Sequence, residues 1–309
     1  MRVIRDNPGR QLLSSSVVTI GNFDGLHRGH QALIGLCQSL AESRHSIAVV
    51  TFEPLPQAWF RPDAAPARLM SVRQKLEFLA AKAIDLTWLL RFNQALAGMD
   101  AESFVQSVLV NTLAAKHIVV GEDFRYGKGR QGGIDSLRRS GERSGYEVHA
   151  VPMIDIDGCR VSSSNIREYL ATGELEQAAH LLGRPFSMAG RVIGGRRLGR
   201  ELGYPTANIR LATSPSPLKG VFAIRARWDD SSWHDGVANL GTRPAVGGEG
   251  FLIEVHLFDF EGDLYGRRLE VEFIKKLRDE AHFEVIDDLV VQMREDERQA
   301  RFCLSQNEN

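Results

Sequence analysis

Apolar runs and amphipathic stretches alternate along the chain from residue 16 to about residue 151. The apolar runs are short and rich in β-branched residues, and they predict strands at 16–20, 46–52, 87–92, 117–121 and 146–151. Between them, residues such as Phe104, Val108 and Leu109 recur at helical spacing, which predicts helices near 29–43, 71–83, 101–115 and 134–144. Because parallel strands are joined by crossover helices, this alternation predicts an α/β domain with a doubly wound parallel sheet.

Loops that follow the strands of such a sheet gather at the edge where ligands bind. The loop at 53–70 contains four prolines, so we expect no regular structure there. A loop of this length is usually functional. The glycine-rich loop at 122–133 carries Phe124, Arg125 and Tyr126. We expect both loops to overhang the binding edge.

The pattern changes after residue 184 to short alternating segments broken by glycine and proline. These segments predict strands of an antiparallel sheet or small β-barrel at 220–228, 234–241, 251–260 and 267–277. The last segment, 284–304, has Ile286, Leu289, Val290 and Met293 on one helical face and predicts a closing helix. We therefore expect two domains, at residues 1–183 and 184–309.

Composition narrows the class of partner. The 309 residues carry a net charge of -1, which gives no overall attraction for nucleic acid or anionic lipid, so we expect small-molecule partners. We find no signal peptide and no apolar run long enough to span a membrane. Three widely separated cysteines suit a reducing cytoplasm better than a disulfide framework. Nucleic-acid and membrane partners are therefore not expected.

The segment GNFDGLHRGH, residues 21–30, joins the first of these strands to a predicted helix. Gly21 and Gly25 allow a ligand to approach the backbone, and a helix N-terminus attracts phosphate. His27 and His30 would then donate hydrogen bonds to that phosphate. Two alternatives stay open: the histidine pair binds a metal, or the histidines only cap the helix.

The segment VSSSNIREYL, residues 161–170, offers the hydroxyls of Ser162, Ser163 and Ser164 at a second predicted helix start. Arg167, one turn further, can hold phosphate oxygens with two parallel hydrogen bonds. The alternative is an ordinary helix cap formed by Asn165 and Glu168.

The segment GRVIGGRRLGRELGYPTANI, residues 190–209, is rich in glycine, including Gly194 and Gly199, and ends in Thr206 and Asn208. Two residues apart in an extended chain, these two side chains point the same way and offer oxygen atoms to a hard cation such as Mg²⁺. Ordinary loop chemistry is the alternative.

The strand, glycine loop and His-x-Gly-His together resemble the Rossmann-like HxGH nucleotidyltransferase superfamily. VSSSNIR resembles the matching motif of FAD synthetases, with Val161 where isoleucine is usual and Ser164 where threonine is usual. The resemblance implies an ATP site built from Gly21, Phe23, Asp24, His27, His30, Ser162, Ser163, Ser164 and Arg167. By position, Phe52, Asp123, Phe124 and Tyr126 are candidates for the flavin and adenine pockets.

The second half resembles the riboflavin kinase module, through Pro-Thr-Ala-Asn at 205–208 and further matches at 236–244, 254–266 and 277–283. The whole chain thus resembles bacterial bifunctional riboflavin kinases/FAD synthetases. The resemblance implies that Gly194, Gly199, Thr206 and Asn208 bind ATP, the last two with Mg²⁺, and that Arg278 contacts flavin. Leu55, Ala245 and His282 depart from the family pattern.

The resemblance also assigns Glu254 as the general base that accepts the proton of the attacking hydroxyl. The strand pattern agrees, because Phe251, Ile253, Val255 and Leu257 share one face, and Glu254 lies on the other. A solvated carboxylate is the alternative.

The implied function is ATP-dependent phosphorylation of riboflavin to FMN by the second domain, followed by adenylylation of FMN to FAD by the first, with release of diphosphate. One rival is an adenylyltransferase for another phosphorylated acceptor, such as a nicotinate or pantetheine phosphate. The other is a flavin or nucleotide sensor without catalysis.

Overall fold

The computed structural model describes residues 1–6, 9–194, 202–211, 216–229, 231–245 and 248–306. The chain divides into two compact units, residues 1–66 with 72–162, and residues 67–71 with 163–309.

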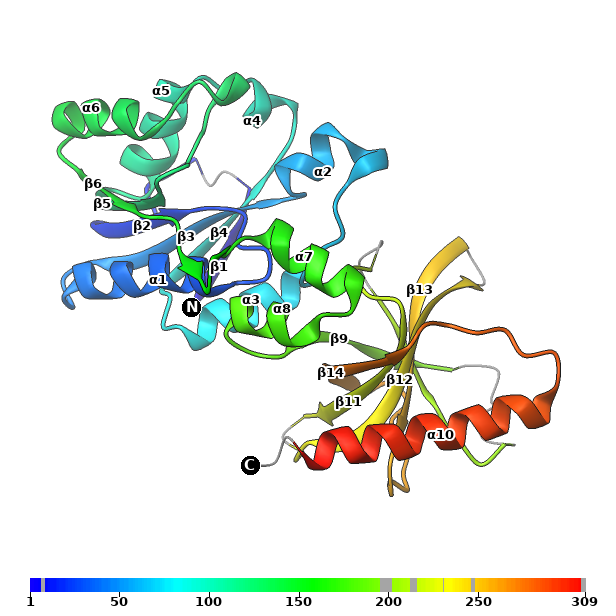
Figure 1. Cartoon of the computed structure of the whole chain (residues 1–309). Coiled ribbons are helices and arrows are strands. Elements are labelled where there is room, and N and C mark those ends of the chain that lie inside the picture. The colour runs from blue at the N-terminus through cyan, green and yellow to red at the C-terminus, as the bar shows by residue number, and fades with distance from the viewer. Residues whose placement is uncertain (7–8, 195–201, 212–215, 230, 246–247, 307–309) are drawn as a thin grey trace. The chain divides into compact units, whose positions relative to one another are not determined.

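The first unit is built on one parallel sheet, with strand order β1-β4-β3-β2-β5-β6 (Figure 1). The strands are β1 (Arg2–Arg5), β2 (Ser16–Ile20), β3 (Ser46–Glu53), β4 (Leu86–Arg91), β5 (Ala115–Gly121) and β6 (Glu147–Val151). The five strands predicted from apolar runs are confirmed. Strand β1 was not predicted, because its RVIR sequence is only four residues long and has arginine at both ends.

Helices surround this sheet on both faces (Figure 1). They are α1 (Arg28–Ala41), α2 (Pro56–Phe60), α3 (Val72–Ala81), α4 (Gln94–Gly98), α5 (Ala101–Phe104), which continues as a π-helix over Val105–Thr112, and α6 (Ile134–Ser144). Short 3-10 turns lie at Pro62–Ala64 and Lys128–Arg130, and β7 (Asp155–Ile156) pairs with β8 (Cys159–Arg160).

The expectation of no regular structure at 53–70 was wrong. Pro56 opens α2 and Pro62 opens the following 3-10 turn. Proline is favoured at the first position of a helix, because the N–H group that it lacks has no partner there anyway.

The core of the first unit lies on both faces of the sheet. Val18, Val50 and Ile118 are fully buried, and they pack with Leu109 and Leu137 from the covering helices. The strands are therefore almost continuously apolar, as parallel strands are when both faces are covered. This rigid sheet fixes the positions of the loops that follow its strands.

The second unit is a closed antiparallel barrel with strand order β10-β13-β12-β11-β14-β9. Its strands are β9 (Phe186–Ile193), β10 (Ala207–Arg210), β11 (Gly220–Trp228), β12 (His234–Ala245), β13 (Gly248–Leu257) and β14 (Arg268–Arg278). Helices α7 (Ser163–Thr172) and α8 (Leu175–Leu182) precede the barrel, and α10 (Ile286–Ser305) ends it (Figure 1). The predicted barrel and closing helix are confirmed, whereas β9 and β10 were not predicted.

Helix α10 packs on the barrel through its second half. Ala300 and Leu304 are fully buried and form a cluster with Ala223 and Phe258. The apolar face predicted for the first half does not pack in this way, since Ile286 is 58% exposed. Leu289 and Met293 instead line a cavity, so this part of the stripe faces a hollow and not the core.

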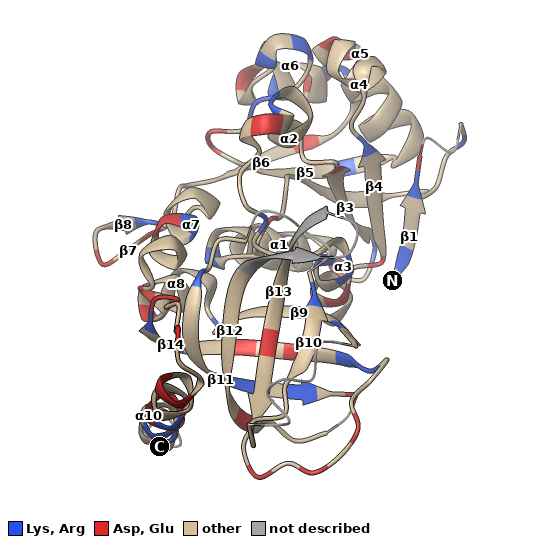
Figure 2. Ribbon diagram, turned by 90° about the vertical axis from the view of Figure 1, so that its right-hand side faces the viewer, with Lys and Arg blue, Asp and Glu red and all other residues tan. Residues whose placement is uncertain are grey.

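Acidic and basic residues are interspersed over the elements of both units (Figure 2), in line with the net charge of -1. Within the described part of the chain, every helix is too short or too polar to cross a membrane.

Candidate functional site

The loop after β2 folds tightly before α1 begins. Phe23, Gly25 and Leu26 all have positive φ, at 47°, 88° and 44°. His27 is the N-cap of α1, and its Nδ1 accepts a hydrogen bond from the backbone N–H of His30 at 3.3 Å. His27 therefore caps the helix, and the N-terminus of α1 follows the glycine loop as the sequence predicts.

The two histidines lie face to face. Their ring centroids are 3.7 Å apart with 18° between the ring planes, and the buried ring of Phe23 lies 5.0 Å from that of His30. A Cβ at Gly29 would come within 3.1 Å of Nδ1 of His27. The glycine of His-x-Gly-His therefore leaves room for the capping ring, and the Phe23 side chain supports His30.

His30 is held in its neutral form. Burial lowers the pKa of His30 well below its usual value of 6.5, and repulsion from His27 and Lys75 lowers it further. Its Nδ1 is buried and has no hydrogen-bond partner among the described residues. An imidazole with an unmatched buried nitrogen can meet a polar ligand group.

Lys75 of α3 is a buried cation that the sequence analysis missed. Only 2% of it is exposed, and its Nζ donates hydrogen bonds to the Asn22 carbonyl at 2.6 Å and to Thr51 Oγ1 at 3.3 Å. The Thr51 hydroxyl in turn donates to the Asn22 carbonyl. Lys75 thus ties the histidine loop to β3. Its position in an amphipathic helix gave no signal, because lysines there usually face solvent.

The segment VSSSNIREYL, residues 161–170, begins beside the start of α1. The Val161 carbonyl oxygen lies 3.8 Å from where a Cβ at Gly29 would stand, so the chain entering this motif reaches the start of α1. Ser162 belongs to the first unit. Ser163 opens α7 in the second unit, where Ser164 is exposed and Nε of Arg167 donates to the Ala67 carbonyl.

Four aromatic rings gather after the ends of β3 and β4. Phe92 makes edge contacts with Phe52, Trp59 and Phe60, at centroid distances of 5.9, 5.6 and 5.7 Å. Phe60 is 61% exposed, so the group offers a free apolar ring surface. Only Phe52 had been predicted. Trp59 and Phe60 were missed because the segment that forms α2 was expected to be irregular. Phe92 was missed because it ends the predicted strand at 87–92 and was not considered as a ligand contact.

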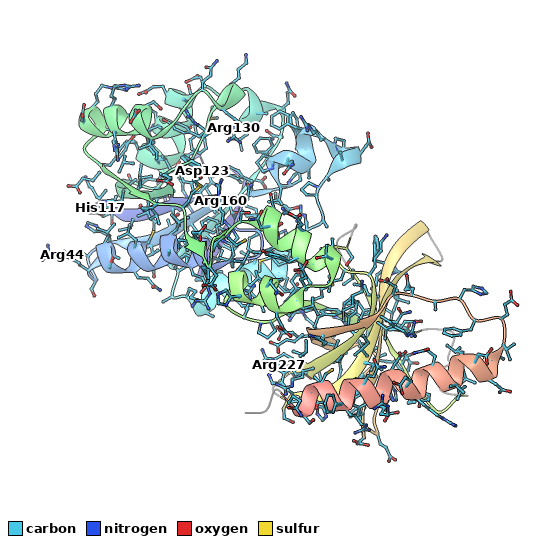
Figure 3. The ribbon with its side chains drawn as sticks, in the orientation of Figure 1. Arg44, His117, Asp123, Arg130, Arg160 and Arg227 are labelled. Carbon is cyan, nitrogen blue, oxygen red and sulfur yellow. The ribbon has the colours of Figure 1, made fainter. Side chains whose placement is uncertain are left out.

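The predicted pocket residues of the glycine-rich loop at 122–133 differ in their exposure to solvent. Asp123 is exposed and pairs with Arg160 at 2.6 Å (Figure 3). Tyr126 is buried, stacks on Phe124 at 5.6 Å and shares a hydrogen bond with Ser136. Asp123 is therefore accessible to a ligand, whereas Tyr126 holds the loop together.

In the barrel, Glu254 lies at the middle of a polar row. It is directly opposite Asn208 of β10 on one side and Asn239 of β12 on the other. Asn208 is buried, and Oδ1 of Asn239 is buried without a hydrogen-bond partner in the described structure. Asn239 was not among the predicted site residues, although it falls within the family match at 236–244.

A cavity of about 260 Å³ opens over this row. Its lining includes Thr206, Asn239, Glu254, Arg278 and Phe283. The structure therefore brings together three predicted residues, Thr206, Glu254 and Arg278. The burial of Ile253 and Val255 agrees with the predicted strand face, which leaves half-buried Glu254 directed away from the barrel core.

His256 fixes the segment that carries Thr206. Its Nδ1 donates to the Pro205 carbonyl at 2.9 Å, and its ring meets Tyr204 edge-on at 5.0 Å. His256 lies two residues after Glu254 on the same face of β13. One strand thus positions both the carboxylate and the Pro-Thr-Ala-Asn segment.

Arg278 is held by α10. Its Nε and Nη2 donate to the two carboxylate oxygens of Asp296, at 2.8 and 2.7 Å. Asp296 also accepts from Gln292 and is only 4% exposed. Asp296 was not among the predicted site residues, because its helix carries no motif that singles it out.

Two predicted glycines and two departures from the family pattern also lie in the second unit's part of the chain. Gly194 is exposed after β9, whereas Gly199 lies outside the described residues. Ala245 ends β12, and His282 is exposed in the loop before α10.

Comparison with known families divides the chain in the same order. Residues 10–165 match the family model for FAD synthetase, and residues 182–304 match the model for riboflavin kinase. A crystal structure of a macrolide-efflux protein from Streptococcus pneumoniae is similar along its whole length. It is 28% identical, with a TM-score of 0.83, and the match covers 97% of this chain and 98% of that one.

Curated relatives match almost the full chain. The bifunctional riboflavin kinase/FMN adenylyltransferase of Pseudomonas fluorescens is 45% identical, with 92% of each chain covered. The protein of the same name from Haemophilus influenzae is 41% identical, covering 97% of this chain and 98% of the relative. The one from Escherichia coli K12 is 42% identical, covering 92% and 91%. The chain belongs to the family of bifunctional riboflavin kinases/FMN adenylyltransferases.

Proposed function

We propose that this chain makes FAD in two ATP-dependent steps. Riboflavin and ATP would give FMN and ADP in the second domain, residues 184–309, and FMN and ATP would give FAD and diphosphate in the first, residues 1–183. The observation that carries this proposal is the placement of Glu254 between two asparagines at a cavity shared with Thr206 and Arg278. The His27–His30 pair at the start of α1 supports the second step.

In the kinase step, Glu254 would accept the proton of the terminal ribityl hydroxyl while that oxygen attacks the γ-phosphorus and ADP leaves. The neighbouring asparagines can hold the carboxylate and the hydroxyl in line. Arg278, anchored by Asp296, would face the flavin and the transferred phosphate from the opposite wall of the cavity. Phe283 on the same wall would exclude water.

Thr206 lines a second, smaller hollow together with Phe260 and residues 262–265. It therefore lies between two cavities, one lined by Glu254 and the other by the loop that includes residues 262–265. We infer that ATP binds on the side of the second hollow and riboflavin in the first. The phosphates would then meet the attacking hydroxyl beside Thr206.

The oxygen atoms around Thr206 are suitable ligands for Mg²⁺. The Thr206 hydroxyl and the Asn208 and Asn239 amides offer neutral oxygen ligands, which suit a hard cation, and Oδ1 of Asn239 is buried without a partner. Thr206 and Asn208 would hold the ion together with phosphate oxygens. Bound there, Mg²⁺ would neutralise phosphate charge. Asn208 keeps its orientation because its strand pairs with both β9 and β13.

In the adenylyl-transfer step, the FMN phosphate is already an anionic nucleophile, so no strong base is required. Neutral His30 and His27 would donate hydrogen bonds to the ATP phosphates. The family resemblance implies phosphate contacts for Ser162, Ser163, Ser164 and Arg167 as well. Gly21 and Asp24 would shape the loop around them. Lys75 would add positive potential and keep the loop in place.

The FMN ring would bind to the aromatic group formed by Phe52, Trp59, Phe60 and Phe92, since flat rings stack well on exposed aromatic surfaces. Asp123 would contact a polar edge of the bound nucleotide or flavin. Leu55, just before α2, is buried and helps to hold that helix in place.

We also propose that the protein works in the cytoplasm, which its sparse, widely separated cysteines support.

The test is to incubate purified protein with riboflavin, ATP and Mg²⁺ and to separate the flavins by chromatography. The proposal expects FMN to appear first and FAD after it. Supplying FMN in place of riboflavin should give FAD alone. Riboflavin and FMN that both remain unchanged would refute it.

A further inference from the structure

Three side chains of the kinds that bind metals lie close together in the first unit, at the opposite end of the sheet from the histidine loop. His117 lies near the start of β5, and Glu147 and His149 lie at the start of β6. His117 is directly opposite Glu147 in the sheet, and His149 is two residues further along β6 on the same face. The strand register therefore brings the three side chains together.

Their ligand atoms are close to one another. His117 Nδ1 lies 3.2 Å from His149 Nε2, and a Glu147 carboxylate oxygen lies 3.7 Å from each of these nitrogens. Two ligand atoms bound to one tetrahedral zinc ion are separated by about 3.4 Å, given zinc–ligand distances near 2.1 Å. The three atoms thus already have nearly the spacing of one face of a zinc tetrahedron.

We propose that His117, Glu147 and His149 bind one Zn²⁺ ion, with water in the fourth position. Two imidazoles and one carboxylate are a ligand set that suits zinc and disfavours Mg²⁺, which prefers oxygen ligands. The histidine side chains are 21% and 26% exposed, and that of Glu147 is 73% exposed, so an ion can reach the site from solvent.

His117 has a further neighbour outside the proposed ligand set. His45 packs edge-on against His117 at 5.6 Å, and its Nδ1 shares a hydrogen bond with the Ser15 hydroxyl.

The site is separate from the proposed catalytic residues. His117 lies near the amino end of β5, whereas the histidine loop follows the carboxyl end of β2, which runs parallel to it. In Figure 3, His117 and Arg44 lie toward one end of the first unit, away from Asp123 and Arg160. A bound ion would link β5 to β6 and stabilise the sheet, without contacting ATP.

The test uses the full chain without an affinity tag, stripped of metal and titrated with Zn²⁺ by calorimetry in the presence of Mg²⁺. We expect one ion per chain and a higher melting temperature, because a ligand that binds only the folded state stabilises it. His149→Gln and the milder Glu147→Gln should each weaken binding at least ~10-fold and abolish the shift. His180→Gln, which changes an exposed histidine on α8, is the control and should bind normally.

Absence of zinc binding to the unaltered protein would overturn the proposal. So would unchanged binding by either His149→Gln or Glu147→Gln, since the ion would then lie elsewhere or lack the carboxylate. Glu147 is an exposed residue, so its variant keeps the test valid even if His149→Gln fails to fold.

Discussion

Asp296 of α10 accepts two parallel hydrogen bonds from Arg278 of β14 and is itself almost completely buried. This pair fixes one wall of the cavity that contains Glu254. The orientation of Arg278 therefore depends on a helix that the sequence places outside every recognised motif. Removing one partner of such a pair destabilises the folded protein strongly, because the remaining buried charge is left without its partner.

We expect Asp296→Asn to lower the free energy of unfolding by about 2–3 kcal/mol, since the Arg278 side chain is partly buried. Riboflavin phosphorylation should fall by about 10- to 100-fold as the guanidinium loses its position. Formation of FAD from supplied FMN should persist. Glu295→Gln removes a neighbouring exposed carboxylate that pairs with Arg298, and this control should behave as the unaltered protein does. Equal kinase rates for the two variants would contradict the assigned role.

The two activities should separate by mutation. Glu254→Gln keeps the size of the side chain but cannot accept a proton, so FMN formation from riboflavin should be abolished while FMN is still converted to FAD. His30→Ala should have the opposite effect. Flavin chromatography with each substrate measures both rates. Loss of both activities in either folded variant would contradict the division into two sites.

Lys75 should matter for adenylyl transfer alone. Lys75→Met removes the buried charge and its hydrogen bonds to Asn22 and Thr51, so FAD formation should drop by about 10-fold or more through displacement of the histidine loop. The pKa of His30 should rise, since one source of repulsion is gone. NMR titration of His30 measures this second effect, which a purely structural role would not predict. The exposed Lys82, changed to Met, is the control.

Acidification should destabilise the protein through His30. Its pKa is lowered in the folded state, so below the unfolded value of 6.5 the unfolded chain binds a proton that the folded chain does not. Stability is unaffected above that pH and falls below it, by up to about 2 kcal/mol at pH 5. Urea unfolding at pH 7 and pH 5 should therefore show a smaller loss for His30→Gln than for the unaltered protein. An identical loss would show that His30 protonates freely.

The exposed aromatic group should bind the flavin of FMN. Phe60→Ala should raise the KM for FMN in adenylylation about 3- to 10-fold, the value expected for one lost ring contact. The KM for riboflavin in the kinase reaction should not change. Phe302→Ala removes an equally exposed phenylalanine from α10 and is the control. An unchanged KM for FMN would place the acceptor elsewhere.

Local patterns were enough to predict the main strands and the barrel. Apolar runs at 16–20 and 220–228 coincide with β2 and β11, because both strands are buried in their own cores. Strand β1 was not predicted because a strand of four residues, two of them arginine, has little apolar pattern. Helix α2 was not predicted because proline was taken to prevent a helix, although at the first position of a helix it favours one.

The motifs predicted candidate side chains for the two sites, whereas the residues that support those side chains came only from the fold. For Glu254, strand alternation predicted the face on which it lies, and the family resemblance implied its role. Lys75 and Asp296 were not predicted, because each has an ordinary local sequence and becomes important through a partner distant along the chain. Asn239 lies within the family match at 236–244, but only its pairing opposite Glu254 singles it out. Buried polar residues of this kind are recognised by what they contact.

The two sheets differ in one further respect. The barrel closes on itself through the pairing of β9 with β10, so every described strand has neighbours on both sides. The parallel sheet ends at β1 and β6, whose outer edges are open to pairing with another chain. The arginines of β1 and the charged start of β6 discourage such pairing. Aggregation under stress should therefore begin in the adenylyltransferase half, and substitutions that remove those edge charges would lower its solubility first.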